Sequence, residues 1–230
     1  MWRLIYSVSA SCAAALPASA GPWAQAPGDL YTRLVVLGER VEGLTAVRSE
    51  FYAEYGLSEV WTATAKAEGA VFFQESEFNQ TGYRATLRRQ VWKRKTALVA
   101  VEAGIIGGEA IGGLNFGCRN VGGEIRVATG ISGVNRGRNW FAYADGAGRF
   151  HTGGCKRQRM EIGAGREFAK DWYMISQFFF QRGVERGRSD KWEGGVMRRF
   201  AKVDIALGVR HEFSGVFRET GVFIAADKRF

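Results

Sequence analysis

Residues 124–132 read EIRVATGIS, and apolar residues occupy alternate positions of this stretch. In an extended chain, Ile125 and Val127 lie on one face and Glu124 and Arg126 on the other, because side chains alternate along a strand. The same period of two recurs in residues 61–68, 97–105 and 204–210. The pattern predicts β-strands rather than amphipathic helices, whose period is 3.6.

Twelve such runs follow one another along the chain. Short connections, as at 57–60, alternate with mostly longer, glycine-rich ones, as at 108–122, which is typical of barrels that cross a membrane. We therefore predict an all-β fold, a transmembrane antiparallel up-and-down barrel of about 12 strands (10–14). The expected strands are 29–40, 46–56, 61–73, 83–92, 96–107, 122–132, 138–148, 157–168, 172–184, 190–200, 203–213 and 219–230.

Composition favours the same fold class. The 230 residues include 31 Gly, 16 Phe, 7 Tyr and 7 Trp but only 3 Pro. After residue 20, no apolar stretch approaches the roughly 18–20 residues that a membrane-spanning helix needs. A helical bundle is therefore excluded.

The first 20 residues have the three parts of a secretory signal peptide. Arg3 supplies the positive charge, residues 4–16 form an apolar core, and residues 18–20 read ASA, a small-residue cleavage site. We expect a signal peptide at 1–20 and an outer-membrane β-barrel at 21–230. A short buried helix is the alternative for the first segment, and lipidation at Cys12 is disfavoured because the usual aliphatic residue does not precede it.

Removal of the signal peptide leaves two cysteines, Cys118 and Cys155. Export into an oxidising compartment makes a disulfide between them the default. It would close a separation of 37 residues and restrain two of the longer loops. Two free thiols are the alternative, because a bridge needs Cα atoms within about 7 Å of each other.

Alternation alone does not tell which face meets lipid, because a soluble ligand-binding barrel turns its apolar face inward. Aromatic residues gather beside the short connections, as expected where a barrel crosses the headgroup region. Core aromatics would instead be spread along the strands. The residues concerned are Tyr55, Trp61, Trp92, Trp140, Phe168, Trp172, Phe200 and Phe230.

The face opposite the apolar one carries charges of both signs. In a closed membrane barrel such residues line a polar interior and pair across strands, whereas in a soluble barrel they would form a solvated outer face. The residues predicted to line the lumen are Arg48, Glu50, Glu54, Arg84, Arg88, Glu102, Glu124, Arg126, Arg159, Glu161 and Arg210. Because this lining is of mixed sign, we expect only a mild preference for anions.

The chain ends on Phe230, and Val222 and Ile224 share its face at steps of two. This pattern resembles the C-terminal assembly signal of bacterial outer-membrane proteins, although Lys228 stands where a hydrophobic residue is more usual. Residues 51–58, FYAEYGLS, resemble a strand-and-turn segment near the start of such barrels. The whole mature chain resembles alphaproteobacterial outer-membrane β-barrels of the porin- or transporter-like kind. The resemblance implies this fold and a location in the outer membrane of a Gram-negative bacterium.

No residue pattern indicates an enzyme, a cofactor or a metal. His211 and Ser214 are three residues apart and would face opposite sides of a strand, so they do not form a catalytic pair. Asp145 and His151 would meet only at the outer rim, and nothing singles them out. The two cysteines and two histidines match no zinc spacing, and no glycine-rich run leads into a helix.

We therefore expect a narrow porin-like channel or transporter for small polar or anionic solutes. The alternatives are a non-conducting structural or adhesive surface barrel and, third, a lipid-acting outer-membrane enzyme. The net charge of +9 would indicate nucleic acid for a soluble protein, but export argues against that partner. We expect as partners the barrel assembly machinery and outer-membrane lipids including lipopolysaccharide, whose phosphates would pair with cations near the longer loops. These cations are Arg119, Lys156, Arg157, Arg182, Arg186 and Arg188.

Overall fold

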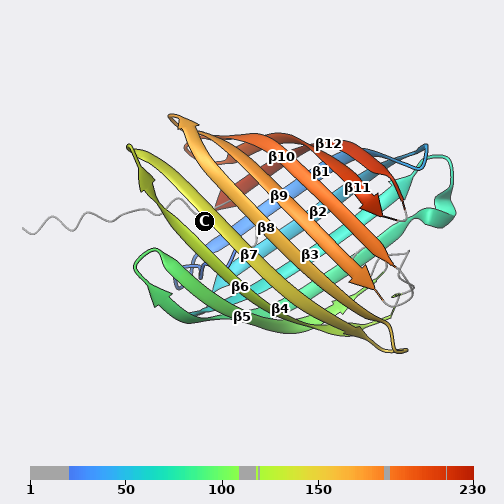
Figure 1. The fold of residues 1–230 in the computed structure, drawn as a ribbon, viewed down its shortest axis with the longest axis horizontal. Helices are drawn as coiled ribbons and strands as arrows, with labels where there is room; N and C mark the ends of the chain where they lie inside the picture. Colours follow the sequence, from blue (N-terminus) through green and yellow to red (C-terminus); the bar gives the residue numbers. More distant parts are fainter. Residues whose placement is uncertain (1–20, 109–117, 119, 184–186, 216) are drawn as a thin grey trace, which may run out of the picture.

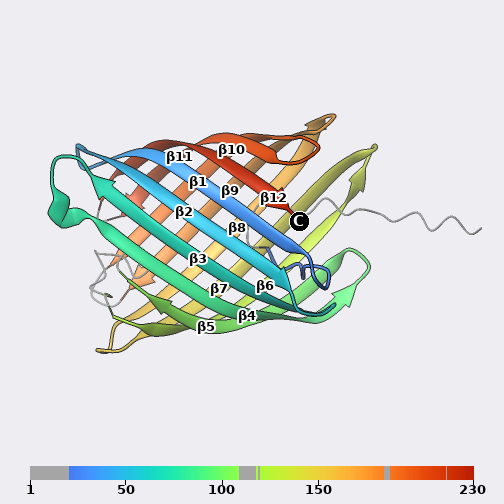
Figure 2. The same ribbon diagram turned by 180° about the vertical axis from the view of Figure 1, so that it is seen from behind.

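A computed structural model describes residues 21–108, 118, 120–183, 187–215 and 217–230 of the chain. Within these ranges the chain forms a closed barrel of twelve antiparallel strands, each paired with its sequence neighbours, and β1 also pairs with β12 (Figures 1 and 2). The predicted fold class is therefore confirmed. The strands are β1 (Leu30–Val41), β2 (Leu44–Gly56), β3 (Trp61–Phe72), β4 (Gln80–Arg94), β5 (Ala97–Gly107), β6 (Gly122–Asn135), β7 (Arg138–His151), β8 (Lys156–Ala169), β9 (Trp172–Gly183), β10 (Arg188–Arg199), β11 (Asp204–Gly215) and β12 (Glu219–Arg229).

The start of β1 and the end of β12 lie at one end of the barrel, because Tyr31 pairs with Arg229. We call this end the termini end and the opposite one the far end. Since the strands alternate in direction, the connections at the termini end are 57–60, 95–96, 136–137, 170–171 and 200–203. The longer connections lie at the far end, where a short 3₁₀ helix, Ser76–Phe78, follows β3.

Several strands extend beyond the runs predicted from the sequence. β4 begins at Gln80 rather than 83, and β7 continues to His151 rather than 148. The added residues are largely glycine or polar, and they continue the ladder, as where Gly122 lies opposite His151. Ladder hydrogen bonds use backbone groups alone, so hydrophobic alternation underestimates the length of such strands.

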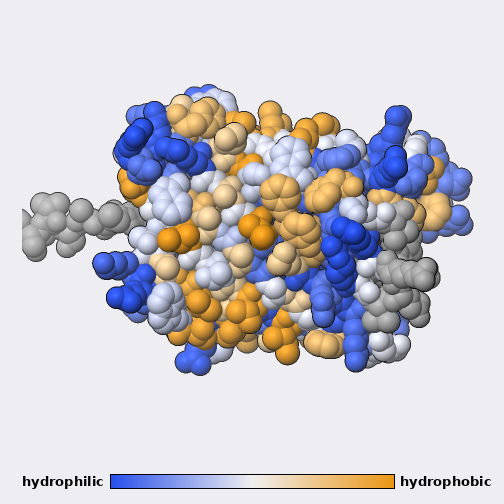
Figure 3. Space-filling view, viewed as in Figure 1, coloured by the Kyte–Doolittle hydropathy of each residue, from blue (hydrophilic) through white to orange (hydrophobic). Residues whose placement is uncertain are grey.

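The barrel is apolar outside and polar inside, the reverse of a soluble protein. Leu207 and Val222 on the outer wall are 61% and 65% exposed, whereas Arg88 and Arg126 in the interior are only 2% and 1% exposed. Apolar residues cover the middle of the face shown in Figure 3, and hydrophilic residues concentrate towards the two ends. The closed ladder pairs backbone groups between strands, as a barrel surrounded by lipid requires.

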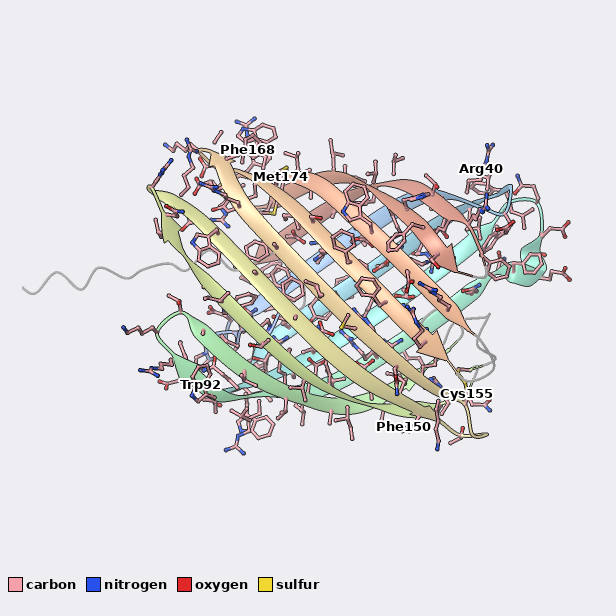
Figure 4. All side chains as sticks on the ribbon, in the orientation of Figure 1. Arg40, Trp92, Phe150, Cys155, Phe168 and Met174 are labelled. Atoms are coloured by element: carbon pink, nitrogen blue, oxygen red, sulfur yellow. A yellow bond between two sulfur atoms is a disulfide. The ribbon has the colours of Figure 1, made fainter. Side chains whose placement is uncertain are left out.

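Aromatic side chains surround the termini end on the outside, and Trp92 and Phe168 project outward there in Figure 4. Guanidinium groups accompany two of them: Arg89 lies 5.4 Å from the ring centre of Trp61, and Arg198 lies 5.2 Å from that of Trp172. Cations and aromatic rings together are typical of the boundary between hydrocarbon and headgroups. The predicted members that are exposed are Tyr55, Trp61, Trp92, Phe168, Trp172, Phe200 and Phe230, and Trp140 is half-buried.

At the far end, Cys118 and Cys155 form a disulfide with their Cα atoms 5.5 Å apart. Cys155 lies in the β7–β8 connection, at the right of Figure 4. The predicted signal peptide at 1–20, Arg119 and Arg186 lie outside the described residues. No helix in the described part of the chain is long and apolar enough to cross a membrane.

Candidate functional site

Ion pairs bridge non-adjacent strands across the interior. The Arg210 guanidinium on β11 binds Glu193 on β10 at 2.6 Å and Glu50 on β2 at 3.0 Å. β1 and β12 lie between β11 and β2, so the second contact spans two strands. Arg84 on β4 likewise binds Glu124 on β6 at 3.2 Å, over the intervening strand β5. The interior is therefore narrow enough for side chains to meet within it.

A second group of ion pairs occupies the wall made by β5, β6 and β7. Arg126 binds Asp145 and lies 3.6 Å from Glu102, and Glu124 accepts a 2.5 Å hydrogen bond from Arg149. All five side chains are at most 6% exposed. Buried ions lose their hydration, and close opposite charges offset that loss when the geometry is good.

The lumen holds a cavity of about 220 Å³. Eight cationic side chains and four carboxylates line it, together with polar and aromatic residues such as Gln177, Gln181 and Phe179. The cations are Arg33, Arg48, Lys66, Arg84, Arg149, Arg159, Lys191 and Arg210, and the carboxylates are Glu50, Glu68, Glu161 and Glu193. Cations outnumber carboxylates two to one in this lining, but five of the eight pair with carboxylates that lie just outside it, so the excess of positive charge is partly offset. These pairs are Arg33–Asp227, Arg48–Glu39, Arg84–Glu124, Arg149–Glu124 and Lys191–Glu219.

All the residues that the sequence assigns to the lumen point to the barrel interior. Arg48, Glu50, Arg84, Arg159, Glu161 and Arg210 line the cavity. Glu54, Arg88, Glu102, Glu124 and Arg126 are buried in the wall outside the lining of that cavity. Alternation along a strand tells whether a side chain points into or out of the barrel, but not whether it reaches the cavity. The sequence therefore does not separate these two sets.

Sequence reasoning missed several cavity residues, and Arg33 shows why. β1 carries apolar side chains on both faces, with Leu34 and Val36 exposed outside and Val35 and Leu37 buried inside. Alternation therefore gives no signal for Arg33. Arg149 lies in the part of β7 that continues beyond the expected strand, which ends at residue 148.

A segment before β1, residues 21–26, enters the lumen at the termini end; we call it the N-terminal segment. Trp23 is 8% exposed and packs with Leu98, Phe141 and Tyr143, with its ring centre 6.3 Å from that of Phe141. The Arg88 guanidinium donates a 2.9 Å hydrogen bond to the Trp23 carbonyl. These partners come from β4, β5 and β7, so the segment reaches across the interior. Nothing in the alternation pattern predicts this placement.

Gln25 and two glycines also position this segment. The backbone N–H of Gln25 donates to the Thr62 hydroxyl at 3.1 Å, and the side-chain amide of Gln25 donates to Glu54. A Cβ on Gly130 would lie 2.6 Å from Cγ of Pro22, and a Cβ on Gly56 would lie 1.9 Å from the Ala26 carbonyl oxygen. Both positions therefore have to be glycine for the segment to lie where it does.

The remaining part of the termini end is filled by side chains of the wall itself. Val35, Tyr173, Met197, Ala206 and Ala225 form a buried cluster contributed by β1, β9, β10, β11 and β12. Together with the N-terminal segment on the β2–β7 side, this cluster closes the lumen at the termini end. The cavity lies beyond this closure, among the charged residues.

The titratable groups considered for catalysis do not come together. Asp145 binds Arg126, whereas Nδ1 of His151 lies 2.8 Å from the Asn120 carbonyl oxygen. His211 is on the outer face, with Nδ1 3.0 Å from the Thr220 hydroxyl. Among the described residues, no group of three His, Cys, Asp or Glu side chains could hold a metal ion.

These features define a class: a closed antiparallel barrel with an apolar outer wall and a charged interior is a transmembrane β-barrel. No protein-family model and no curated protein matches the chain.

Solved outer-membrane channels share the fold. A KdgM porin superposes with a TM-score of 0.63 at 8% identity, covering 86% of this chain and 99% of the porin. A NanC porin gives 0.60 at 10% identity, covering 85% and 98%. The COG4313 outer membrane channel from Pseudomonas putida F1 gives 0.57 at 8% identity, covering 92% and 99%. The chain therefore has the fold of these channels.

Proposed function

We propose that this protein is an outer-membrane channel that passes small polar or anionic solutes through its lumen. The observation that carries the proposal is the cavity lining, in which eight cations face four carboxylates. Such a lining gives a mild preference for anions, because cationic groups reach the cavity surface while the carboxylates paired behind them offset part of their charge. The lipid-exposed wall and the fold shared with outer-membrane channels support the location. Export by a signal peptide at residues 1–20 belongs to the same proposal.

The size of the cavity supports small solutes. Its volume of about 220 Å³ is below the roughly 300–1,000 Å³ of pockets that enclose drug-sized ligands. Side chains such as Glu50 and Arg210 bind each other over two intervening strands and so occupy part of the interior. The lumen therefore suits solutes of a few heavy atoms that can exchange hydrogen bonds with its charged wall.

A solute-entry assay tests the proposal. The purified chain is placed in liposomes, and the entry of small carboxylates is compared with that of ammonium compounds of the same size. We expect faster entry of the carboxylates. Equal rates, or faster entry of the cations, would contradict the anion preference.

The runner-up is a structural surface barrel without conductance, and the closed termini end is the observation that favours it. Absence of entry for every solute, both in the whole chain and in a chain lacking residues 21–26, would select this alternative. The chain without the N-terminal segment is needed because a closed lumen also blocks entry in a genuine channel.

We further propose that the outer wall binds lipopolysaccharide phosphates at Arg182 and Arg188. Both guanidinium groups bind Asp190, whose side chain is 1% exposed, while their own side chains remain 45% and 54% exposed. Phe178 and Phe180 stack on each other on the same outer face of β9 as Arg182. Phe180 is two residues and Phe178 four residues before Arg182, towards the middle of the strand. Two arginines held above an aromatic pair at the far end suit the phosphates of a lipid headgroup.

Native mass spectrometry with lipopolysaccharide tests this partner. Replacing Arg182 and Arg188 by Gln should reduce the bound fraction several-fold. The matched control, R89Q/R198Q, removes two exposed guanidinium groups at the termini end and should leave binding unchanged. Equal loss in both variants would indicate a general effect of charge and would exclude a site at Arg182 and Arg188.

A further inference from the structure

The closure at the termini end has two halves of different kinds. One half is the cluster that includes Tyr173 and Met197, whose members belong to strands of the closed ladder. The other half is the N-terminal segment, which precedes β1 and pairs with no strand along its length. Only this second half can leave the lumen without breaking the barrel.

The polar contacts that hold the N-terminal segment are few and can be exchanged. Arg88 donates to the Trp23 carbonyl but also binds Glu54 at 2.8 Å, so its charge stays paired when the segment leaves. Glu54 in turn accepts from the side chains of Gln25 and Tyr52. Departure of the segment therefore leaves an ion pair facing the lumen rather than an isolated buried charge.

A tight turn forms the base of the segment. The Asp29 amide donates to the Ala26 carbonyl at 3.0 Å across Pro27 and Gly28, and Gly28 has φ +86°. Proline followed by a glycine with positive φ is the signature of a type II turn. Gly28 and Asp29 are also tied to Gly56 by backbone hydrogen bonds of 2.9 and 3.0 Å. The anchored turn confines any movement to residues 21–26.

We propose that residues 21–26 are a plug that gates the channel. In the described state, Trp23 and Pro22 block the termini end on the β2–β7 side. The channel opens when the plug swings out about the Pro27–Gly28 turn, which leaves a passage walled by Arg88, Glu54 and Tyr143. This inference rests on the proposed channel function and adds the element that controls it.

Conductance in planar bilayers measures the gate directly. The whole chain is compared with a chain lacking residues 21–26, after both are shown to fold by their altered migration in SDS without heating. We expect the shortened chain to be open for at least ten times more of the recording than the whole chain.

A single substitution provides a second way to displace the plug while the segment stays in place. In G130A the new Cβ would lie 2.6 Å from Pro22 and 3.0 Å from the Trp23 ring, so the segment has to move. The matched control is G38A, because a Cβ on Gly38 meets nothing within 4 Å. We expect increased opening in G130A and wild-type behaviour in G38A.

A reversible cross-link provides the opposite test. The backbone N–H of Gln25 donates to the Thr62 hydroxyl at 3.1 Å, which places the two residues side by side. Cysteines at both positions, in Q25C/T62C, are therefore designed to form a disulfide that holds the plug inside. We expect this variant to be silent until a reductant is added. The wild-type chain with and without reductant controls for the native bridge between Cys118 and Cys155.

The outcomes separate the gate from the channel. Equal, non-zero conductance of the whole chain, the shortened chain and the oxidised Q25C/T62C variant would overturn the plug and leave the channel function standing. Absence of conductance in every folded variant, including the shortened chain, would overturn both the channel function and the gate. Reductant-dependent opening of the cross-linked variant, together with opening of the shortened chain, would establish the gate.

Discussion

Arg126 shows how single residues hold the interior of this barrel together. Its side chain is 1% exposed and binds Asp145 on β7, with Glu102 on β5 at 3.6 Å. The opposite charges of the three groups pair in a region that bulk water scarcely reaches. Removal of the guanidinium would leave two buried carboxylates without the cation that pairs with both.

We predict that R126L lowers the free energy of unfolding by about 3–5 kcal/mol, the usual cost of removing one partner of a buried ion pair. Urea unfolding of the protein refolded in detergent micelles measures the change. The control is R89L, because Arg89 lies on the outside against Trp61. A loss below about 1 kcal/mol, the range of surface ion pairs, would show that Arg126 is well hydrated.

We propose that Phe230 belongs to a C-terminal assembly signal and is needed for assembly more than for the stability of the finished barrel. Its side chain is 63% exposed, and its backbone pairs with Leu30 at 2.9 and 3.4 Å. Nζ of Lys228 lies 3.9 Å from its ring centre, so the residue that departs from the usual pattern packs on the terminal aromatic. Val222 and Ile224 lie exposed on the same outer face.

Deletion of Phe230 should therefore lower the amount of protein in the outer membrane of cells several-fold, because the unfolded chain is delivered less efficiently and meets proteases. The same variant refolded in detergent should still form a barrel, since a partly exposed aromatic contributes at most about 1.5–3 kcal/mol. Immunoblots of membrane fractions and gels of refolded protein check the two halves. Normal levels in cells would remove the assembly role.

At the scale of elements, alternation along the sequence predicts strands well because it reflects one dominant constraint, a wall with lipid on one side. It fails where that constraint is absent. Both faces of β1 are apolar, so Arg33 is not assigned to the lumen, and the N-terminal segment has no alternation at all. The segment is positioned by long-range contacts such as Trp23 with Phe141, which no local pattern encodes.

The far-end connections provide a prediction at this scale. Cys118 and Cys155 form a bridge between the connections that follow β5 and β7, closing a separation of 37 residues. Thiol labelling of unreduced, denatured protein should therefore modify no cysteine in the chain from residue 21 onward. Reduction before labelling is the positive control and should give two labelled cysteines. Labelling of both without reduction would contradict the bridge.

At the scale of the whole molecule, closure of the ladder from β1 to β12 leaves no free strand edge. The strands pair around the whole barrel, with bulges at Val91, Phe168 and Phe213, so opening it in lipid or detergent would expose many backbone groups at once. We predict that the folded protein resists SDS without heating and migrates differently after boiling. Identical migration before and after boiling, with helical circular dichroism, would contradict the barrel.

The proposed function depends on an anion preference of the lumen, and the reversal potential of the shortened chain in asymmetric salt measures this preference. With more KCl on one side, we predict a reversal potential of the sign expected for chloride preference. R149Q/R159Q, which removes two of the eight cations of the cavity, should move it towards cations, and R89Q on the outer wall should not. A cation-selective potential in the unaltered lumen, or no change in R149Q/R159Q, would contradict an anion-preferring lumen.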